Sequence, residues 1–258
     1  MTEQEILFKK AVSAVQAAGS LLTGPGTDLA VSEKGRTDFV TRVDTAVQAR
    51  LQQELSALAP DFQFMGEEKD NREIDPSRAL WILDPVDGTT NLIHGFRQST
   101  ISLALADGGQ VFGGIVYQPF AGELFTAFRG RGAFLNGAPL QVSRAACLRD
   151  SLVSVGTNPG RRENADAAFA RMRRIYDRCH DIRRVGAASL ELCWVAAGRL
   201  DGYLEHGLKP WDYAAGGLIL QEAGGTITDF SGCPLPCGQA GDVVGTNSRI
   251  HKELITLL

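Results

Sequence analysis

The sequence has few cysteines, no CxxC pair and no long hydrophobic run. Its five cysteines are odd in number and lack metal-ligand spacing, which argues against a secreted disulfide framework and against a zinc site. Cys233 and Cys237 in GCPLPCG could be a redox pair or two reduced loop thiols. The first ten residues, MTEQEILFKK, are too charged for a signal peptide, and no later run approaches a membrane span. We therefore expect a cytoplasmic protein without a membrane partner.

The chain also lacks an excess of positive charge. A formal net charge of -4 disfavours nonspecific binding to nucleic acid, which depends on phosphate neutralisation. The arginine-rich run RMRRIYDRCHDIRR (171–184) is interrupted by Asp177 and Asp181, which favours a solvated helix face. We expect no nucleic-acid partner, and an anionic substrate would need a local source of positive charge.

The 258 residues are enough to bury one sizeable core and are arranged in alternating patterns of helix and strand. Amphipathic spacing predicts a helix over residues 4–22 and another after Thr41, where Thr41 and Asp44 match a capping box. A meander of strands is predicted in the middle of the chain, at 62–65, 80–83, 99–106, 111–117 and 123–128. From about residue 150 we expect strands at 152–156 and 200–205, and helices at 163–178, 188–198 and from Pro210 to near Gly224. The simplest division is two lobes, 1–145 and 146–258, that form one compact unit with a site between them.

Two aspartates directly follow an apolar strand in WILDPVDGTTNLIHG (81–95). Asp84 is expected to project from the end of strand 80–83, and Thr89 to begin a helix whose N–H groups could hold an anion. Two carboxylates about 4 Å apart repel by roughly 4 kcal/mol at an effective dielectric of 20. A divalent cation would remove that repulsion, and oxygen ligands favour Mg²⁺ or Mn²⁺ over Zn²⁺. Turn and cap residues remain the alternative interpretation of this stretch.

Further acidic residues follow other predicted elements in a comparable way. Strand 62–65 leads into Glu67 and Glu68, and Asp212 lies in the first turn of the helix that begins near Pro210. Asp212 by itself is more typical of a helix start. Acids at the ends of separate elements nevertheless indicate one shared cation site.

Three sequence blocks resemble the signature blocks of the inositol monophosphatase family, within the lithium-sensitive, magnesium-dependent phosphatase superfamily. They are GEE (66–68), WILDPVDGTTNLIHG (81–95) and LKPWDYAAGGLILQEAGG (208–225). The resemblance extends through DFVTRVD (38–44), GRGAFLNGAPLQVS (130–143) and RRVGAASLELCWVAAGRLDGYLEHG (183–207), with order and spacing intact. It implies a layered αβαβα sandwich of the inositol monophosphatase and fructose-1,6-bisphosphatase type, in the α+β or α/β class. It also implies a homodimer that lithium inhibits.

The same resemblance implies a site with two to three Mg²⁺ ions, which Mn²⁺ can replace. Glu67, Asp84 and the Val86 carbonyl would hold the first ion, and a weaker third ion would sit beside Glu67. Asp84, Asp87 and Asp212 would hold the second. Asp44 and Thr89 match the pair that orients and helps deprotonate the attacking water, so Glu67, Thr89 and Asp44 are the expected catalytic residues. Hydrolysis would be direct and in line, without a phosphoenzyme.

The substrate implied by the resemblance is a small phosphorylated polyol or sugar, with myo-inositol 1-phosphate as the first choice. The phosphate would rest on the N–H groups of Gly88 and Thr89. The organic half would face residues that match the family's inositol pocket: Asp87, Gly186, Ala187, Ala188, Glu205 and Asp212. Animal members have Gly-Thr-Ala where this chain has Gly186-Ala187-Ala188, so one hydroxyl contact is missing and strict preference for inositol stays open.

Several alternatives remain within and outside the superfamily. Fructose 1,6-bisphosphate, histidinol phosphate and adenosine 3',5'-bisphosphate are the rival substrates. A regulatory protein-binding module that keeps the fold is the alternative to an enzyme. The roles of Lys34 and Glu68 are left open by the sequence.

Overall fold

The computed structural model describes residues 2–24, 31–35 and 38–258. Within these ranges the strands form two large sheets and one two-stranded ribbon, β1 (Val31–Gly35) and β2 (Asp38–Thr41). The seven-stranded sheet follows chain order: β3 (Gln63–Gly66), β4 (Leu80–Asp87), β5 (Thr100–Asp107), β6 (Gln110–Gln118), β7 (Glu123–Phe128), β8 (Ala133–Leu135) and β9 (Ala138–Pro139). β3 and β4 are parallel, and every later pair is antiparallel. The predicted meander is therefore confirmed from β4 onward.

The five-stranded sheet comes from the second half of the chain and has a crossed order. Its strands lie in the order β11 (Asp181–Arg183), β10 (Leu152–Val155), β12 (Gly202–Leu208), β14 (Gly241–Thr246) and β13 (Thr226–Thr228). The helices are α1 (Glu3–Ala18), α2 (Ser20–Thr23), α3 (Arg42–Leu58), α4 (Thr89–Ile93), α5 (Ala165–Tyr176), α6 (Ala188–Ala196), α7 (Pro210–Glu222) and α8 (His251–Ile255). Two short 3₁₀ turns, η1 (Leu148–Asp150) and η2 (Pro159–Asn164), flank β10.

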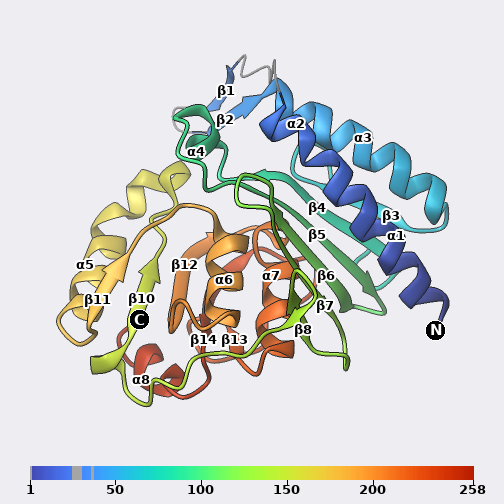
Figure 1. Cartoon of the computed structure of the whole chain (residues 1–258). Coiled ribbons are helices and arrows are strands. Elements are labelled where there is room, and N and C mark those ends of the chain that lie inside the picture. Colours follow the sequence, from blue (N-terminus) through green and yellow to red (C-terminus); the bar gives the residue numbers. More distant parts are fainter. Residues whose placement is uncertain (1, 25–30, 36–37) are drawn as a thin grey trace.

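The two sheets and their helices stack as five layers (Figure 1). Helices α1 and α3 cover the outer face of the seven-stranded sheet, α6 and α7 lie between the sheets, and α5 and α8 cover the far side of the five-stranded sheet. The predicted layered αβαβα architecture is confirmed. Within the described ranges, no helix is both long and apolar enough to cross a membrane.

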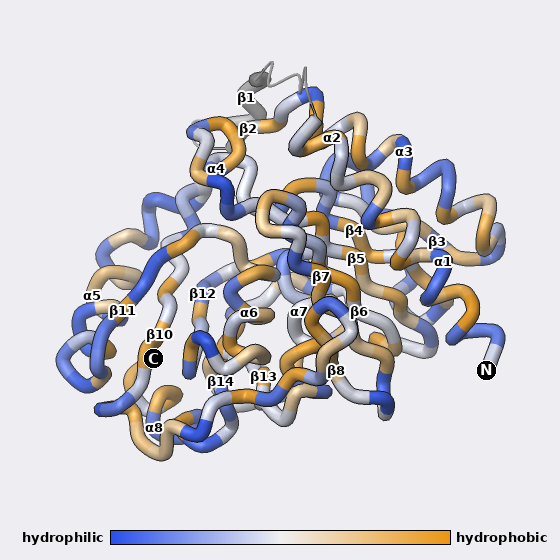
Figure 2. The backbone as a smooth tube through the Cα atoms, in the orientation of Figure 1, coloured by the Kyte–Doolittle hydropathy of each residue, from blue (hydrophilic) through white to orange (hydrophobic). Residues whose placement is uncertain are grey.

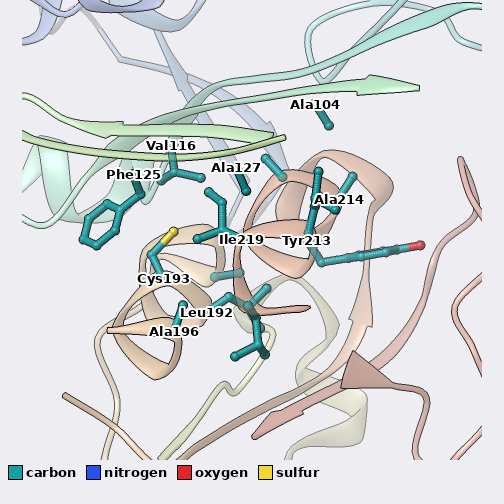
Figure 3. Close-up of a cluster of buried hydrophobic side chains, with 14 of the residues drawn as sticks. Ala104, Val116, Phe125, Ala127, Leu192, Cys193, Ala196, Tyr213, Ala214 and Ile219 are labelled. Atoms are coloured by element: carbon teal, nitrogen blue, oxygen red, sulfur yellow. The ribbon is translucent and has the colours of Figure 1, made fainter. Parts of the chain in front are cut away.

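Alternating side chains on the strands fill the spaces between these layers. Trp81 and Leu83 of β4 pack toward α1 and α3, whereas Leu80 and Ile82 pack toward α6 and α7. The tube in Figure 2 is correspondingly hydrophobic along β4 and β5 and hydrophilic on the outer side of α3. Figure 3 shows the middle layer, where Leu192 and Cys193 of α6 and Ile219 of α7 lie beneath Val116 and Phe125.

The structure corrects several boundaries. The strand expected to end at residue 83 continues to Asp87, and the helix expected over 4–22 divides at Gly19 into α1 and α2. The strands β1, β2, β8, β9, β11, β13 and β14 and the helix α8 were not predicted, because most are short or lack clear periodicity. The sheets change between Pro139 and Leu152, but α6 and α7 pack against both, so the division into lobes 1–145 and 146–258 stays a prediction.

Close packing of α7 on β6 can be tested at Gly114. A Cβ atom at this position would lie 2.7 Å from the backbone oxygen of Ala215 in α7. We expect Gly114→Ala to lower the free energy of unfolding by about 1–3 kcal/mol, measured by urea denaturation, because α7 must move away from the sheet. Gly241→Ala is the matched strand control, since its nearest neighbour would be a Leu235 methyl at 3.5 Å. Equal stability of the two variants would contradict this packing.

Candidate active site

A bulge in β4 places its two aspartates on the same face of the sheet. Residues three apart in a regular strand point to opposite faces. Here Asp84 pairs with Ser102 and Asp87 pairs with Thr100, so three residues of β4 span two residues of β5. The bulged segment between Asp84 and Asp87 contains Pro85, which has no N–H to donate to the neighbouring strand. Asp84 and Asp87 are 2% and 7% exposed, so both carboxyl groups are held inside the protein.

Asp87 joins β4 to the middle helix layer. Its Oδ1 accepts a hydrogen bond from the N–H of Ala188 (3.1 Å), and its Oδ2 accepts from the N–H (2.7 Å) and hydroxyl (2.5 Å) of Ser189. These are the first two residues of α6, so Asp87 caps that helix from another element. Burial raises the pKa of Asp87 to about 6, although the hydrogen bonds from Ser189 and Ala188 oppose the shift.

Asp44 and Thr89, the pair implied by the family resemblance, are joined by a hydrogen bond. Asp44 also caps α3, and the two contacts use different oxygens of its carboxylate. Asp44 Oδ2 accepts from the N–H and hydroxyl of Thr41, which completes the capping box of α3. Asp44 Oδ1 accepts from Thr89 Oγ1 at 2.9 Å. The Thr89 hydroxyl also lies 3.0 Å from the carbonyl oxygen of Val86. This arrangement brings the start of α3 against the start of α4.

The carboxylates of the site act on one another electrostatically. Burial and the negative charges of Glu67, Asp87, Asp212 and Asp44 raise the pKa of Asp84 well above its ordinary value. Burial, Glu67 and Asp87 raise the pKa of Asp212 in the same direction. In the described part of the chain, no lysine or arginine forms an ion pair with Asp44, Asp84, Asp87 or Asp212. Among the described residues, the charges of these four aspartates are therefore not paired with a basic side chain.

These side chains fit a hard divalent cation by their chemistry. They supply only oxygen donors, and their mutual repulsion is relieved when a cation binds. Among the described residues, no three histidine, cysteine or acidic side chains form a ready-made ligand cluster. The carboxylates are instead turned toward backbone N–H groups: Asp84 toward Val86 at 2.9 Å and Asp212 toward Lys209 at 2.7 Å. Within the described ranges, Val86 donates to Asp84 Oδ1 and Lys209 to Asp212 Oδ2, and no other described donor reaches either carboxylate.

The predicted pocket residues of the second half lie beside this acidic group. Ala187 and Ala188 are buried at the start of α6, and Gly186 precedes them in a left-handed conformation with φ of 88°. This left-handed φ favours glycine, and a Cβ here would also lie 2.4 Å from the guanidinium of Arg184, which would have to move. Glu205 is 8% exposed and accepts from the N–H of Asn158 (2.7 Å) and the hydroxyl of Tyr203 (2.8 Å).

Glu191 is a buried acidic residue that sequence reasoning missed. It lies in the first turn of α6, a helix whose other residues are mostly apolar and buried. Its side chain turns back toward the loop that precedes the helix. The signal that could have found it is a glutamate within the apolar run SLELCWVAA. Burial raises its pKa to about 7, although hydrogen bonds from Ser154 and from the backbone of Val185 and Gly186 lower it.

The sequence left open the roles of Glu68 and Lys34 and the redox state of Cys233 and Cys237. The N–H of Glu68 donates to Gln48 Oε1 at 2.9 Å, which ties the strand end after β3 to α3. The side chain of Lys34 lies outside the described residues. Cys233 is exposed and Cys237 half-buried, and neither forms a disulfide in the structure.

Comparison with known proteins decides the relationship of this chain. The model of the inositol monophosphatase family matches residues 3–258. The chain belongs to the inositol monophosphatase family. The resemblance predicted from the sequence blocks is thus confirmed.

Individual family members match over nearly their full lengths. The inositol-1-monophosphatase of Rhizobium meliloti is 40% identical over 251 residues, covering 96% of this chain and 94% of the relative. The Nus factor SuhB of Escherichia coli K12 is 38% identical over 252 residues, covering 95% and 92%. Among solved structures, inositol monophosphatase II of Staphylococcus aureus with bound inositol monophosphate has a TM-score of 0.84 and 28% identity, covering 97% and 92%. The family is generally metal-dependent, which agrees with the oxygen-only donor set.

The raised pKa of Glu191 predicts how this family member's stability depends on pH. The folded chain binds a proton on Glu191 up to about pH 7, whereas in the unfolded chain the group titrates near 4.5. Ionisation of this group therefore costs folding free energy as the pH rises through that window. With a chelator present, we expect the unfolding free energy of the natural chain, relative to Glu191→Gln, to fall by roughly 3 kcal/mol between about pH 5 and pH 8. Urea denaturation at several pH values measures this, and parallel profiles of the two proteins would contradict it.

Proposed function

We propose that this protein is a magnesium-dependent phosphomonoesterase whose preferred substrate is inositol monophosphate. The observation that carries the proposal is the pair Asp84 and Asp87, which the β4 bulge holds on one face within a buried acidic group. Asp44 and Thr89 supply a proton-accepting pair beside it. Membership of the inositol monophosphatase family supports a phosphatase, and inositol is the finer part of the proposal.

The residues that would hold the metal are the ones implied by the family blocks. Glu67, Asp84 and the Val86 carbonyl would hold one ion, and Asp84, Asp87 and Asp212 a second, with a weaker third beside Glu67. When bound there, Mg²⁺ or Mn²⁺ supplies a water of lowered pKa and neutralises the leaving alkoxide. Positive charge from the metal also gives the acidic chain its attraction for an anionic substrate.

The chain's own residues direct the proton of the attacking water. The Thr89 hydroxyl donates to Asp44 Oδ1, so the lone pairs of Thr89 Oγ1 are left to accept a hydrogen bond from that water. Proton transfer from the water to Thr89, with the Thr89 proton passing to Asp44, leaves hydroxide to attack phosphorus in line. Thr41 holds the other oxygen of Asp44 and fixes the orientation of the carboxylate.

The substrate would lie across the ends of β4, α6 and β12. Its phosphate would face the N–H groups of Gly88 and Thr89, and its hydroxyl groups would face Glu205 and the loop from Gly186 to Ala188. The Staphylococcus aureus relative with bound inositol monophosphate supports this class of substrate. Ala187 offers no hydroxyl, so we expect a looser preference among polyol and sugar phosphates than in members that have threonine at this position.

Phosphate release from a panel of substrates tests the proposed activity. We expect magnesium-dependent release, with inositol 1-phosphate preferred over fructose 1,6-bisphosphate, histidinol phosphate and adenosine 3',5'-bisphosphate. Asp84→Asn should lower kcat by about 100-fold or more, because it removes a charge shared by both ions. Asp107→Asn is the matched control, an exposed aspartate at the end of the neighbouring strand β5. Activity that a chelator leaves unchanged would overturn the mechanism, and a preference for another phosphate would overturn only the substrate.

Metal binding can be tested separately from catalysis by thermal unfolding. Mg²⁺ at about 100 times its Kd should stabilise the folded protein by roughly 3 kcal/mol, which corresponds to a rise in Tm of roughly 5–10 °C for a chain of this size. Relief of carboxylate repulsion is the physical reason. The same titration should shift Tm of Asp107→Asn as in the natural chain and leave that of Asp84→Asn nearly unchanged. Equal shifts in both variants would remove Asp84 from the metal site.

The family resemblance extends the proposal to a homodimer that acts in the cytoplasm and that lithium inhibits. Light scattering after gel filtration reports the first property, and lithium titration of the phosphatase reports the last.

A second candidate function follows from the relatives named Nus factor SuhB, which match this chain about as well as the inositol-1-monophosphatases do. It is a regulatory role that depends on binding another macromolecule through the same fold. The Asp84→Asn variant separates the two functions. A cellular role that survives in this inactive but folded variant would favour the regulatory one.

A further inference from the structure

The Glu191 side chain, which is ionised above about pH 7, is surrounded by hydrogen-bond donors between the two sheets. Its Oε1 accepts from the Ser154 hydroxyl on β10 and from the N–H of Val185 at 3.2 Å. Its Oε2 accepts from the N–H groups of Gly186 at 3.0 Å and Ala187 at 3.2 Å. The residue is 0% exposed. Three consecutive backbone N–H groups thus converge on one side chain that lies four to six residues beyond them.

Glu191 and Asp87 together account for five consecutive N–H groups at the start of α6. Those of residues 185–187 donate to Glu191, and those of Ala188 and Ser189 donate to Asp87. The division between the two carboxylates falls within the loop that is proposed to face the organic half of the substrate. The conformation of this loop is therefore set by two acidic side chains, of which only Asp87 is proposed to touch metal or substrate.

Burial prevents Glu191 from acting directly on a substrate. A carboxylate with both oxygens occupied by donors and no exposed surface has no path for proton transfer to a reacting group. Replacing one of its oxygens by an amide NH₂ would leave at least one of these N–H groups without an acceptor, at a cost of about 1–3 kcal/mol. The loop would then turn those N–H groups toward other acceptors. The nearest in the chain is the Asp87 carboxylate, which already accepts from the next two N–H groups, those of Ala188 and Ser189.

We propose that Glu191 is a positioning residue for substrate recognition: its carboxylate fixes the loop 185–188 so that this loop can discriminate the hydroxyl-bearing half of the substrate. Asn91 supports the same loop from α4, since its Nδ2 donates to the carbonyl of Val185 at 3.1 Å. Glu191 thus accepts from the N–H groups of this loop, and Asn91 donates to one of its carbonyl groups. This inference rests on the proposed phosphatase function.

The test compares two substrates in the Glu191→Gln variant. Inositol 1-phosphate carries ring hydroxyls for the loop to recognise, whereas p-nitrophenyl phosphate carries none. We expect kcat/KM for inositol 1-phosphate to fall by about tenfold or more, mainly through KM, which corresponds to the loss of one or two positioned hydrogen bonds. For p-nitrophenyl phosphate we expect a change within about threefold. A merely structural role would lower both values together, and such a parallel loss would overturn the proposal, as would no loss for either.

Glu222→Gln is the matched control. Glu222 at the end of α7 also accepts two backbone N–H groups, those of Gly130 and Gly132, each at 2.9 Å, but it holds a different loop. Its ratio of kcat/KM for the two substrates should equal that of the natural chain. Ser154→Ala provides a milder variant in case Glu191→Gln does not fold, because it removes one of the four donors to Glu191. It should shift the ratio in the same direction by a smaller factor.

Amide hydrogen exchange keeps the two proposals separable. In Glu191→Gln the N–H groups of residues 185–187 should exchange at least tenfold faster than in the natural chain, with the rate in β4 unchanged. An inactive natural chain would refute the phosphatase proposal, and the exchange measurement would still decide whether Glu191 holds the loop. Unchanged exchange at residues 185–187 would overturn the positioning role whatever the activity.

Discussion

In the described part of the chain, backbone N–H groups hold six acidic residues in and beside this site. Each of the six carboxylates accepts from at least one N–H group: the donors to Asp87 and Glu205 lie far away in the chain, whereas those to Asp44, Asp84 and Asp212 lie within three residues. The pairs are Asp44 with Thr41, Asp84 with Val86, Asp87 with Ala188 and Ser189, Glu191 with residues 185–187, Glu205 with Asn158, and Asp212 with Lys209. A peptide N–H fixes the direction of a carboxylate without cancelling its charge. The charge therefore stays available to attract a cation. A paired lysine or arginine would instead neutralise the carboxylate and take the place of the cation.

The layered architecture is what allows donors from a distant segment to meet Asp87. The seven-stranded sheet presents Asp84 and Asp87 toward the middle layer, where the start of α6 receives Asp87. Helix α7 lies against the same sheet and carries Asp212 in its first turn. The outer helix α3 contributes Asp44 from the opposite side through its capping box. A site built this way depends on the spacing between layers, since each contributes a rigid part of it.

Much of the site chemistry was readable from local patterns. The capping box at Thr41 and Asp44, the helix beginning at Pro210 and the acids that follow strands all appeared in the sequence, and the structure brings Asp44 to Thr89 and places Asp84 among charged neighbours. The sequence interpretation ended this strand at residue 83, which was wrong because β4 continues to Asp87. A proline between two aspartates normally indicates a turn. Glu191 was missed because three of its four donors are peptide N–H groups, which no residue type marks in the sequence.

The sequence by itself determined the family and the oxygen-only chemistry of the acidic residues, and the resemblance to that family implied the five layers. These properties depend on residue type and on the order and spacing of the sequence blocks. Only the tertiary structure decided that a bulge turns Asp84 and Asp87 to one face, and that Asp87 and Glu191 divide five N–H groups between them. The direction of a side chain depends on strand register and on donors far away in the chain. That information exists only once the layers have packed.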